Sequence, residues 1–257
     1  MPSPKDHAID LYMGAIRDGD AEAALDRNIG DRYTQHSMGV KDGKQGFLEF
    51  FEPFLERNPV REMEVVRALE DGAYVFLHVY QKLNGGEAEW VTMDFFDSDA
   101  DGKIVEHWDV ISPYVAKNPS GRSNIEGPVE ITDRNHTAAN KEVVAGFIQT
   151  CLVEGQAARM EEFIKPDTYI QHNTDVGDGI DGLRALLNDA DQPLRYSENV
   201  LLVGEGNFVA ALNRVTWGGQ ELCVADLFRL EGGKIVEHWD NIEPVPPRED
   251  WANSGKF

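Results

Sequence analysis

The sequence predicts an α+β protein made of two similar domains, and three observations support this. The octapeptide Gly102–Asp109 recurs unchanged as Gly233–Asp240, which indicates an internal duplication. In each copy, apolar residues first follow helical spacing and then alternate strictly with polar ones. Glycine-containing turn pairs separate the alternating stretches, as they do in antiparallel hairpins. We therefore expect helices packed on one face of a curved antiparallel sheet, twice along the chain.

Further matches extend the repeat over nearly the whole chain. Tyr33–His36 is similar to Tyr169–His172, and Asp94–Phe96 to Asp226–Phe228. Each copy is therefore a whole small domain, too long for a solenoid unit of roughly 20–50 residues. Proline and glycine are frequent between the copies and at the end of the chain. The expected divisions are domain 1 at 1–118, a linker at 119–133, domain 2 at 134–245 and a C-terminal tail at 246–257.

The first repeat begins with three predicted helices. Apolar residues three and four positions apart indicate a helix from about residue 8 to 16, which Gly19 ends, and two more helices follow at 21–27 and 43–57. A short strand at 31–36 lies between the last two helices. After Pro59 the pattern has period two, which predicts strands at 61–69, 73–83, 88–96 and 103–111.

The second repeat shows the same series. Helices are expected at 135–154, 157–164 and 180–190, with a short strand at 169–172 before the third helix. The alternating stretches predict strands at 194–203, 207–217, 221–230 and 234–242.

Composition restricts the partners of the protein. The 257 residues contain 24 Lys and Arg against 46 Asp and Glu, for a net charge of −22. Such a charge opposes binding to nucleic acid and to anionic membranes, so neither is expected as a partner. The two cysteines lack the spacing of a zinc site or a disulfide framework. The first residues lack the apolar stretch of a signal peptide, and we expect a cytoplasmic protein.

Two aspartates on predicted strands are the first candidate site residues. Asp94 shares a strand face with Trp90, Thr92 and Phe96, and Asp226 lies in a similar apolar setting. A carboxylate among large apolar side chains must be paired, hydrogen-bonded or protonated. One interpretation is a structural aspartate bonded to a neighbouring strand's histidine. The other is an acid with a raised pKa that donates a hydrogen bond to a substrate oxygen.

The histidines are the second set of candidates. His36 and His172 each end a strand at the expected rim of a domain, where an imidazole can act as a general base. The alternative is a helix-entry residue bonded to backbone. Side-chain alternation places His107 with Asp109 on one strand face, and the same holds in the second repeat for His238 and Asp240. These pairs are candidates for orienting a ligand, or for purely structural contacts within the sheet.

A metal centre is a further alternative. His36, His107 and Asp109 offer two imidazoles and one carboxylate, a set that open iron and zinc sites use. Their spacing does not require them to converge, so the expectation is that neither pocket holds a metal.

The motifs resemble those of a known family. Tyr169–Asn173, Asp178-Gly179, Asp226–Arg229 and Gly233–Asp240 are similar to segments of SnoaL-like polyketide cyclases and their aldol-condensation relatives, in the nuclear transport factor 2-like superfamily. Ala225–Arg229 more remotely resembles a segment of ketosteroid isomerases. The resemblance implies a cone in each repeat, the cystatin-like arrangement, in which a bent sheet wraps around helices and leaves a deep apolar pocket.

The resemblance also implies an activity. A cofactor-independent enzyme of this kind removes a proton beside a carbonyl group of a small or polycyclic substrate, and isomerisation, cyclisation or aldol chemistry follows. By similarity, His172 and His36 are the bases, Asp226 and Asp94 are acids or oxyanion donors, and His238 with Asp240 and His107 with Asp109 orient the substrate. The implied ligand contacts are Tyr33, Tyr169, Asn173, His78 and Trp90.

Some residues depart from the family pattern, and a second function stays open. Ser37 stands where the second repeat has Asn173, whereas His78 and Trp90 stand where the second repeat has leucines. The two pockets therefore need not share a ligand. The alternative function is a binding or assembly module that does no chemistry. Because members of the superfamily commonly pair, we expect the two repeats to form an internal pseudo-dimer, with a solution mass near 28.7 kDa.

Overall fold

A computed structural model describes residues 2–257, and the chain divides into two compact units. Unit 1 consists of the first repeat up to Pro113 together with the tail Pro246–Phe257, and unit 2 is Tyr114–Val245. The stretch expected as a linker thus packs with the second repeat, and the tail packs with the first. Among residues 2–257, no helix is both long and apolar enough to cross a membrane.

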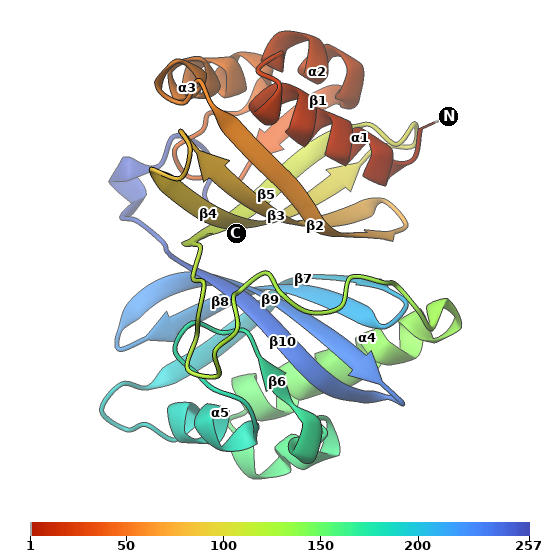
Figure 1. The fold of residues 1–257 in the computed structure, drawn as a ribbon, viewed down its shortest axis with the longest axis vertical. Helices are drawn as coiled ribbons and strands as arrows, with labels where there is room; N and C mark the ends of the chain where they lie inside the picture. Colours follow the sequence, from red (N-terminus) through yellow and green to blue (C-terminus); the bar gives the residue numbers. More distant parts are fainter. Residues whose placement is uncertain (1) are drawn as a thin grey trace. The chain divides into compact units, whose positions relative to one another are not determined.

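Three helices of unit 1 cover one face of its sheet (Figure 1). Helix α1, Pro4–Tyr12, begins at Ser3, whose hydroxyl accepts a hydrogen bond from Asp6 N while the Asp6 carboxylate accepts one from Ser3 N. This capping box fixes the start of the helix. A π-helical turn, Met13–Arg17, extends α1. Helices α2, Ala21–Asn28, and α3, Gly43–Arg57, follow where the apolar spacing predicted them.

The sheet of unit 1 has the strand order β1-β5-β4-β3-β2. Its last four strands form the predicted antiparallel meander, but β1 pairs with β5 in parallel, so the sheet is mixed. The parallel pair arises because α3 and three strands separate β1 from β5 in the chain. The strands are β1 Ile29–Gln35, β2 Arg61–Asp71, β3 Tyr74–Leu83, β4 Ala88–Ser98 and β5 Ile104–Pro113.

Unit 2 repeats this topology with strand order β6-β10-β9-β8-β7, and β6 is again parallel to its neighbour. Its second expected helix is a short 3₁₀ helix, Ala157–Glu162. The helices include α4 Thr137–Phe147, continued by a π turn over Ile148–Val153, and α5 Ile180–Leu187. The strands are β6 Ile170–Gln171, β7 Leu194–Glu205, β8 Phe208–Trp217, β9 Gln220–Glu231 and β10 Lys234–Pro244.

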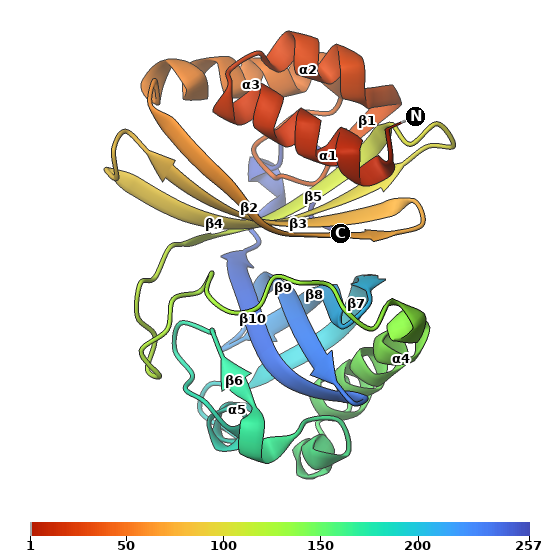
Figure 2. The same ribbon diagram turned by 45° about the vertical axis from the view of Figure 1, so that its right-hand side comes forward.

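In each unit the core lies between the helices and the concave face of the sheet (Figures 1 and 2). In unit 1, Leu11 and Leu25 from the helices pack with Val75 and Leu77 from β3. In unit 2, Phe147 and Ile148 pack with Val209 and Phe228. The predicted pair of α+β cones is confirmed, and the space that the helices leave unfilled becomes a pocket in each unit.

Candidate active site

Strand pairing brings two carboxylates together in each pocket. Asp94 of β4 lies directly opposite Asp109 of β5, and Asp226 of β9 lies opposite Asp240 of β10. Because side chains alternate along a strand, the histidine two residues before the second aspartate faces the same pocket. Each unit therefore presents one imidazole and two carboxylates to its pocket.

In unit 1, Asp94 is buried and hydrogen-bonded through both oxygens. His107 Nε2 lies 3.0 Å from Asp94 Oδ1, and Thr92 Oγ1 donates to Asp94 Oδ2 at 2.6 Å. Tyr12 adds a 2.8 Å bond to the Thr92 hydroxyl, which extends the chain of hydrogen bonds to α1. Burial raises the pKa of Asp94, although the bond from His107 opposes that rise. This carboxyl therefore holds a proton more readily than an exposed aspartate.

The second carboxylate of unit 1 has a cationic partner. Lys256 Nζ lies 2.9 Å from Asp109 Oδ1, and both side chains are buried. Burial would raise the pKa of Asp109, but the charges of Lys256 and His107 outweigh it and hold the pKa below its ordinary value. Asp109 is thus a carboxylate at neutral pH.

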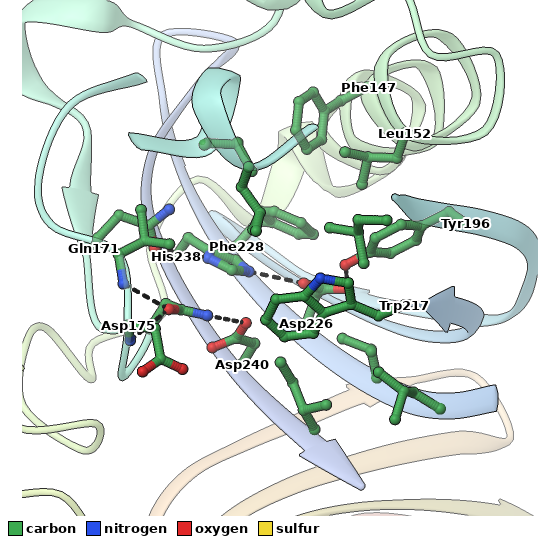
Figure 3. A pocket seen from close by; sticks show the side chains of 18 of the residues that line it. Phe147, Leu152, Gln171, Asp175, Tyr196, Trp217, Asp226, Phe228, His238 and Asp240 are labelled. Atoms are coloured by element: carbon green, nitrogen blue, oxygen red, sulfur yellow. Dashed lines mark hydrogen bonds and ion pairs between the residues drawn. The ribbon is translucent and has the colours of Figure 1, made fainter. Parts of the chain in front are cut away.

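In unit 2, His238 lies between a glutamine and an aspartate (Figure 3). Its Nδ1 lies 2.9 Å from Gln171 Oε1 and its Nε2 lies 2.8 Å from Asp226 Oδ1. The glutamine oxygen accepts a hydrogen bond from the Nδ1–H group, so the proton in the second hydrogen bond lies between Nε2 and the carboxylate. Burial lowers the pKa of His238, but the bond to Asp226 and the charge of Asp240 reverse this and raise it.

Asp240 is bonded to an amide where Asp109 is paired with a lysine. Its Oδ2 accepts a 2.6 Å hydrogen bond from Asn173 Nδ2, a neutral donor. Burial, with the charge of Asp226, raises the pKa of Asp240 to about 6. The corresponding carboxyl groups of the two units, Asp109 and Asp240, are therefore shifted in opposite directions.

The two pockets also differ in size. The pocket of unit 1 has a cavity volume of about 330 Å³, and that of unit 2 has a volume of about 70 Å³. Leucines and Trp217 narrow the second pocket, whereas Phe50 and Trp90, both more than one third exposed, lie at the first. Both walls are mainly apolar. Of the expected ligand contacts, Tyr33 and Trp90 line the first pocket, and Tyr169 and Asn173 line the second.

The second pocket has the better donor set for a metal ion. Ligand atoms of Asp226, His238 and Asp240 all lie within 4.8 Å of one another. One imidazole and two carboxylates suit a divalent cation. The metal ligands considered from the sequence, His36, His107 and Asp109, do not come together. The His36 ring stacks on Trp108, on the face of the sheet opposite to His107 and Asp109.

The rim histidines do not line either pocket. His36 Nδ1 donates to Gly255 O and its Nε2 lies 2.9 Å from Glu106 Oε1, while its ring stacks on Trp108. His172 makes the matching contacts with Ser123 O, Glu237 and Trp239. Glu106 and Trp108 point away from the pocket because His107, between them, points into it. The geometry therefore corresponds to the backbone-bonded alternative, and we withdraw the general-base assignment.

His78 is a second correction. It is fully buried, but it lies on the face of β3 opposite to Val79 and Gln81, and its Nδ1 is 3.1 Å from Arg67 Nη1. It does not line the pocket of unit 1. Alternation along β3 explains this position, since Leu77 and Val79 occupy the pocket face.

Two further segments contribute to the sites without a clear signal in the sequence, the chain around Asn118 in unit 2 and the tail around Asn253 in unit 1. Asn118 Nδ2 donates to Gln171 O and Asn173 O in unit 2, and Asn253 Nδ2 donates to Ser37 O and Val40 O in unit 1. Each asparagine comes shortly after the last strand of one repeat and belongs to the unit of the other. The signal was a weak repeat, since both asparagines precede a Ser-Gly pair and a basic residue, Arg122 or Lys256.

Comparison with known proteins identifies the domain type. A model of the SnoaL-like domain matches the chain twice, over residues 9–107 and 144–238. TsrD from Streptomyces laurentii is 23% identical over 41% of this chain and 89% of that chain, with a TM-score of 0.34. A putative polyketide cyclase from Bacillus cereus is 20% identical over 42% of this chain and 72% of that chain, with a TM-score of 0.37.

A putative ketosteroid isomerase from Kribbella flavida is 14% identical over 44% of this chain and 87% of that chain, with a TM-score of 0.37. A search of curated protein sequences finds no match to this chain.

Proposed function

Because the chain belongs to the SnoaL-like domain family, we propose that it is an enzyme that transfers protons at the carbon beside a carbonyl group of an organic substrate. The observation that carries the proposal is the pairing of an imidazole with two buried carboxylates in an apolar pocket, which occurs in both units. Proton transfer needs a base and an acid held on one side of a water-poor cavity.

The two carboxyl groups of each pocket have different roles in this proposal. Asp109 in unit 1 and Asp240 in unit 2 are the bases that remove the proton. The neighbouring pairs, His107 with Asp94 and His238 with Asp226, share a proton with the oxygen of the enolate that forms. A hydrogen bond to developing negative charge in an apolar pocket is the largest single source of rate acceleration in such reactions.

Pocket size sets the class of substrate. The first pocket has room for a polycyclic compound, and the second accepts a smaller carbonyl compound. Isomerisation, cyclisation and aldol reactions all begin with the same proton removal. In each of these reactions the proton transfers use only side chains of the pocket, and no step is assigned to a cofactor.

The test is deuterium exchange at the α-carbon of a panel of ketones and β-dicarbonyl compounds, followed by NMR. Asp94→Asn and Asp226→Asn each remove the acid of one pocket while preserving the side chain's shape. We expect exchange above the buffer rate, and a loss of at least tenfold in the variant of the active pocket. Exchange that neither variant reduces would refute the assignment.

A second function, ligand binding without chemistry, is favoured by one observation in unit 1. Both oxygens of Asp94 are hydrogen-bonded within the protein, and Asp109 is paired with Lys256. A pocket whose charges are satisfied internally suits a neutral, mainly apolar ligand. Line broadening of a ligand by NMR without any exchange would support this function over catalysis.

A further inference from the structure

The C-terminal tail follows a fixed path along the rim of unit 1. Ala252 N donates to Met38 O at 2.9 Å, and Asn253 Nδ2 donates to Ser37 O at 2.7 Å and to Val40 O at 2.8 Å. These bonds hold the tail on the segment that leaves β1, which also carries Ser37 into the pocket wall.

A tight turn then directs the chain inward. Gly255 has φ +117°, and a Cβ atom at this position would lie 2.4 Å from the ring of Trp251. Only glycine fits such a turn without strain. The carbonyl of Gly255 accepts a hydrogen bond from His36 Nδ1 at 2.5 Å. The backbone immediately before Lys256 is therefore fixed.

Lys256 is buried to 1% exposure, and its ammonium group lies 2.9 Å from Asp109 Oδ1. Placing an ammonium group in an apolar environment costs several kcal/mol unless it is well paired. Unit 2 has the same fold without such a lysine. There Asn173 binds the matching carboxylate, and Arg122 of the rim segment pairs with the partly exposed Asp178. The fold itself therefore does not require a buried cation at this carboxylate.

We propose that Lys256 is a positioning residue of the first pocket, which holds Asp109 ionised and in one orientation, so that the C-terminal tail is part of the site. Its catalytic consequence rests on the proposed function, because Asp109 is the base assigned there. The first pocket then keeps Asp109 ionised at neutral pH beside the Lys256 ammonium group.

The groups that face Asp109 come from four elements and the tail. They are Lys256 of the tail, His107 of β5, Asp94 of β4, Tyr12 of α1 and Tyr33 of β1. Of these, Lys256 has the strongest lowering effect on the pKa of Asp109, whereas the matching carboxyl without a lysine, Asp240, has a raised pKa of about 6.

The first arm of the test measures the unfolding midpoint in urea between pH 5 and pH 8. Lys256→Met keeps the length of the side chain and removes its charge. In this variant Asp109 resembles Asp240, so its folded-state pKa rises and stability falls as the pH increases through that value. Asp240 contributes the same fall with pH in all three proteins, and we expect the midpoint to decrease more steeply with pH in Lys256→Met than in the wild type and in Lys256→Arg.

Two controls make this arm decisive. Adding Asp109→Asn to Lys256→Met should remove the extra pH dependence. Arg122→Met removes the basic residue of unit 2 that corresponds to Lys256, and it should leave the dependence of the unfolding midpoint on pH as it is in the wild type. A Lys256→Met midpoint that falls equally at every pH, with no change when Asp109→Asn is added, would show a packing role and overturn the proposal.

The second arm measures deuterium exchange at pH 7 with Asp226→Asn present, so that only the first pocket acts. We expect Lys256→Ala to reduce the turnover number at least tenfold, and n-propylammonium, which reproduces the atoms that the substitution removes, to restore part of the loss. The neutral n-propanol should not restore it. Lys256→Ala with unchanged turnover would overturn the catalytic part of the proposal. If the Asp226→Asn protein shows no exchange, the proposed function fails in this pocket, and the urea profiles still decide the role of Lys256.

Discussion

The carboxyl groups of Asp226 and Asp240 lie directly opposite each other on β9 and β10, and His238 Nε2 is bonded to the first of them. Like charges in such a pair repel each other across the strands. Burial in apolar surroundings, to which this repulsion adds, raises the pKa of Asp240 to about 6. In unit 1 the matching pair includes the Lys256 ammonium, which removes this effect from Asp109.

Asp240→Asn should increase stability at pH 8. A carboxyl whose pKa is raised in the folded state stabilises the protein below its ordinary pKa, and this contribution is lost as the pH rises through about 6. With an ordinary value near 3.8, the change amounts to roughly 3 kcal/mol at about 1.4 kcal/mol per pKa unit. Urea unfolding of both proteins at pH 5 and pH 8 measures the part of this change that falls above pH 5, about 1.4 kcal/mol or one pKa unit. An identical difference at both pH values would contradict the prediction.

Asp109→Asn should have the opposite effect. A carboxyl with a lowered pKa stabilises the folded protein above its ordinary pKa, and the contribution is lost only as the pH falls through the lower folded value. At pH 7 the variant leaves Lys256 buried without its anion, which costs about 3–5 kcal/mol. The loss should be nearly constant from pH 5 to pH 8. A stabilised variant in this range would show that Lys256 does not hold Asp109 ionised.

His172→Phe should destabilise the protein without changing its chemistry. Phenylalanine keeps an aromatic ring against Trp239 but loses the bonds to Glu237 and to Ser123 O. Leaving those buried acceptors with fewer partners costs about 1–3 kcal/mol. Thermal unfolding gives the stability change, and deuterium exchange per folded molecule gives the activity. A large drop in that exchange rate would return His172 to the role of base.

The sequence predicts the helices and strands of the two domains, but it does not predict the contacts at the edges of the two pockets. The local signals are the repeat Gly102–Asp109, the helical spacing of apolar residues and the hairpin turns. Because each depends only on neighbours in the chain, they predict the helices, the strands and the shared face of His107 and Asp109. The direction of the His36 side chain does not follow from the sequence, because the strand β1 ends one residue earlier, at Gln35. The side chain that contacts His107 is that of Gln35, not that of His36. Lys256 was missed because nothing local indicates which unit a tail will join.

The last prediction concerns the difference in pocket size. Trp90 lines the first pocket at 37% exposure, and the corresponding Leu222 is buried in the second. N-phenyl-1-naphthylamine is a neutral aromatic probe whose fluorescence increases in apolar sites. It should bind the first pocket, and Trp90→Ala should weaken binding about tenfold, because an aromatic contact contributes about 0.5–1.5 kcal/mol beyond area burial. Leu222→Ala is the matched control and should leave the affinity of the first pocket unchanged.

Anilinonaphthalene sulfonate, which adds a negative charge to the same skeleton, should bind more weakly than the neutral probe, because Asp94 and Asp109 face the ligand. Equal weakening by both substitutions would place the probe outside the first pocket and contradict the size argument.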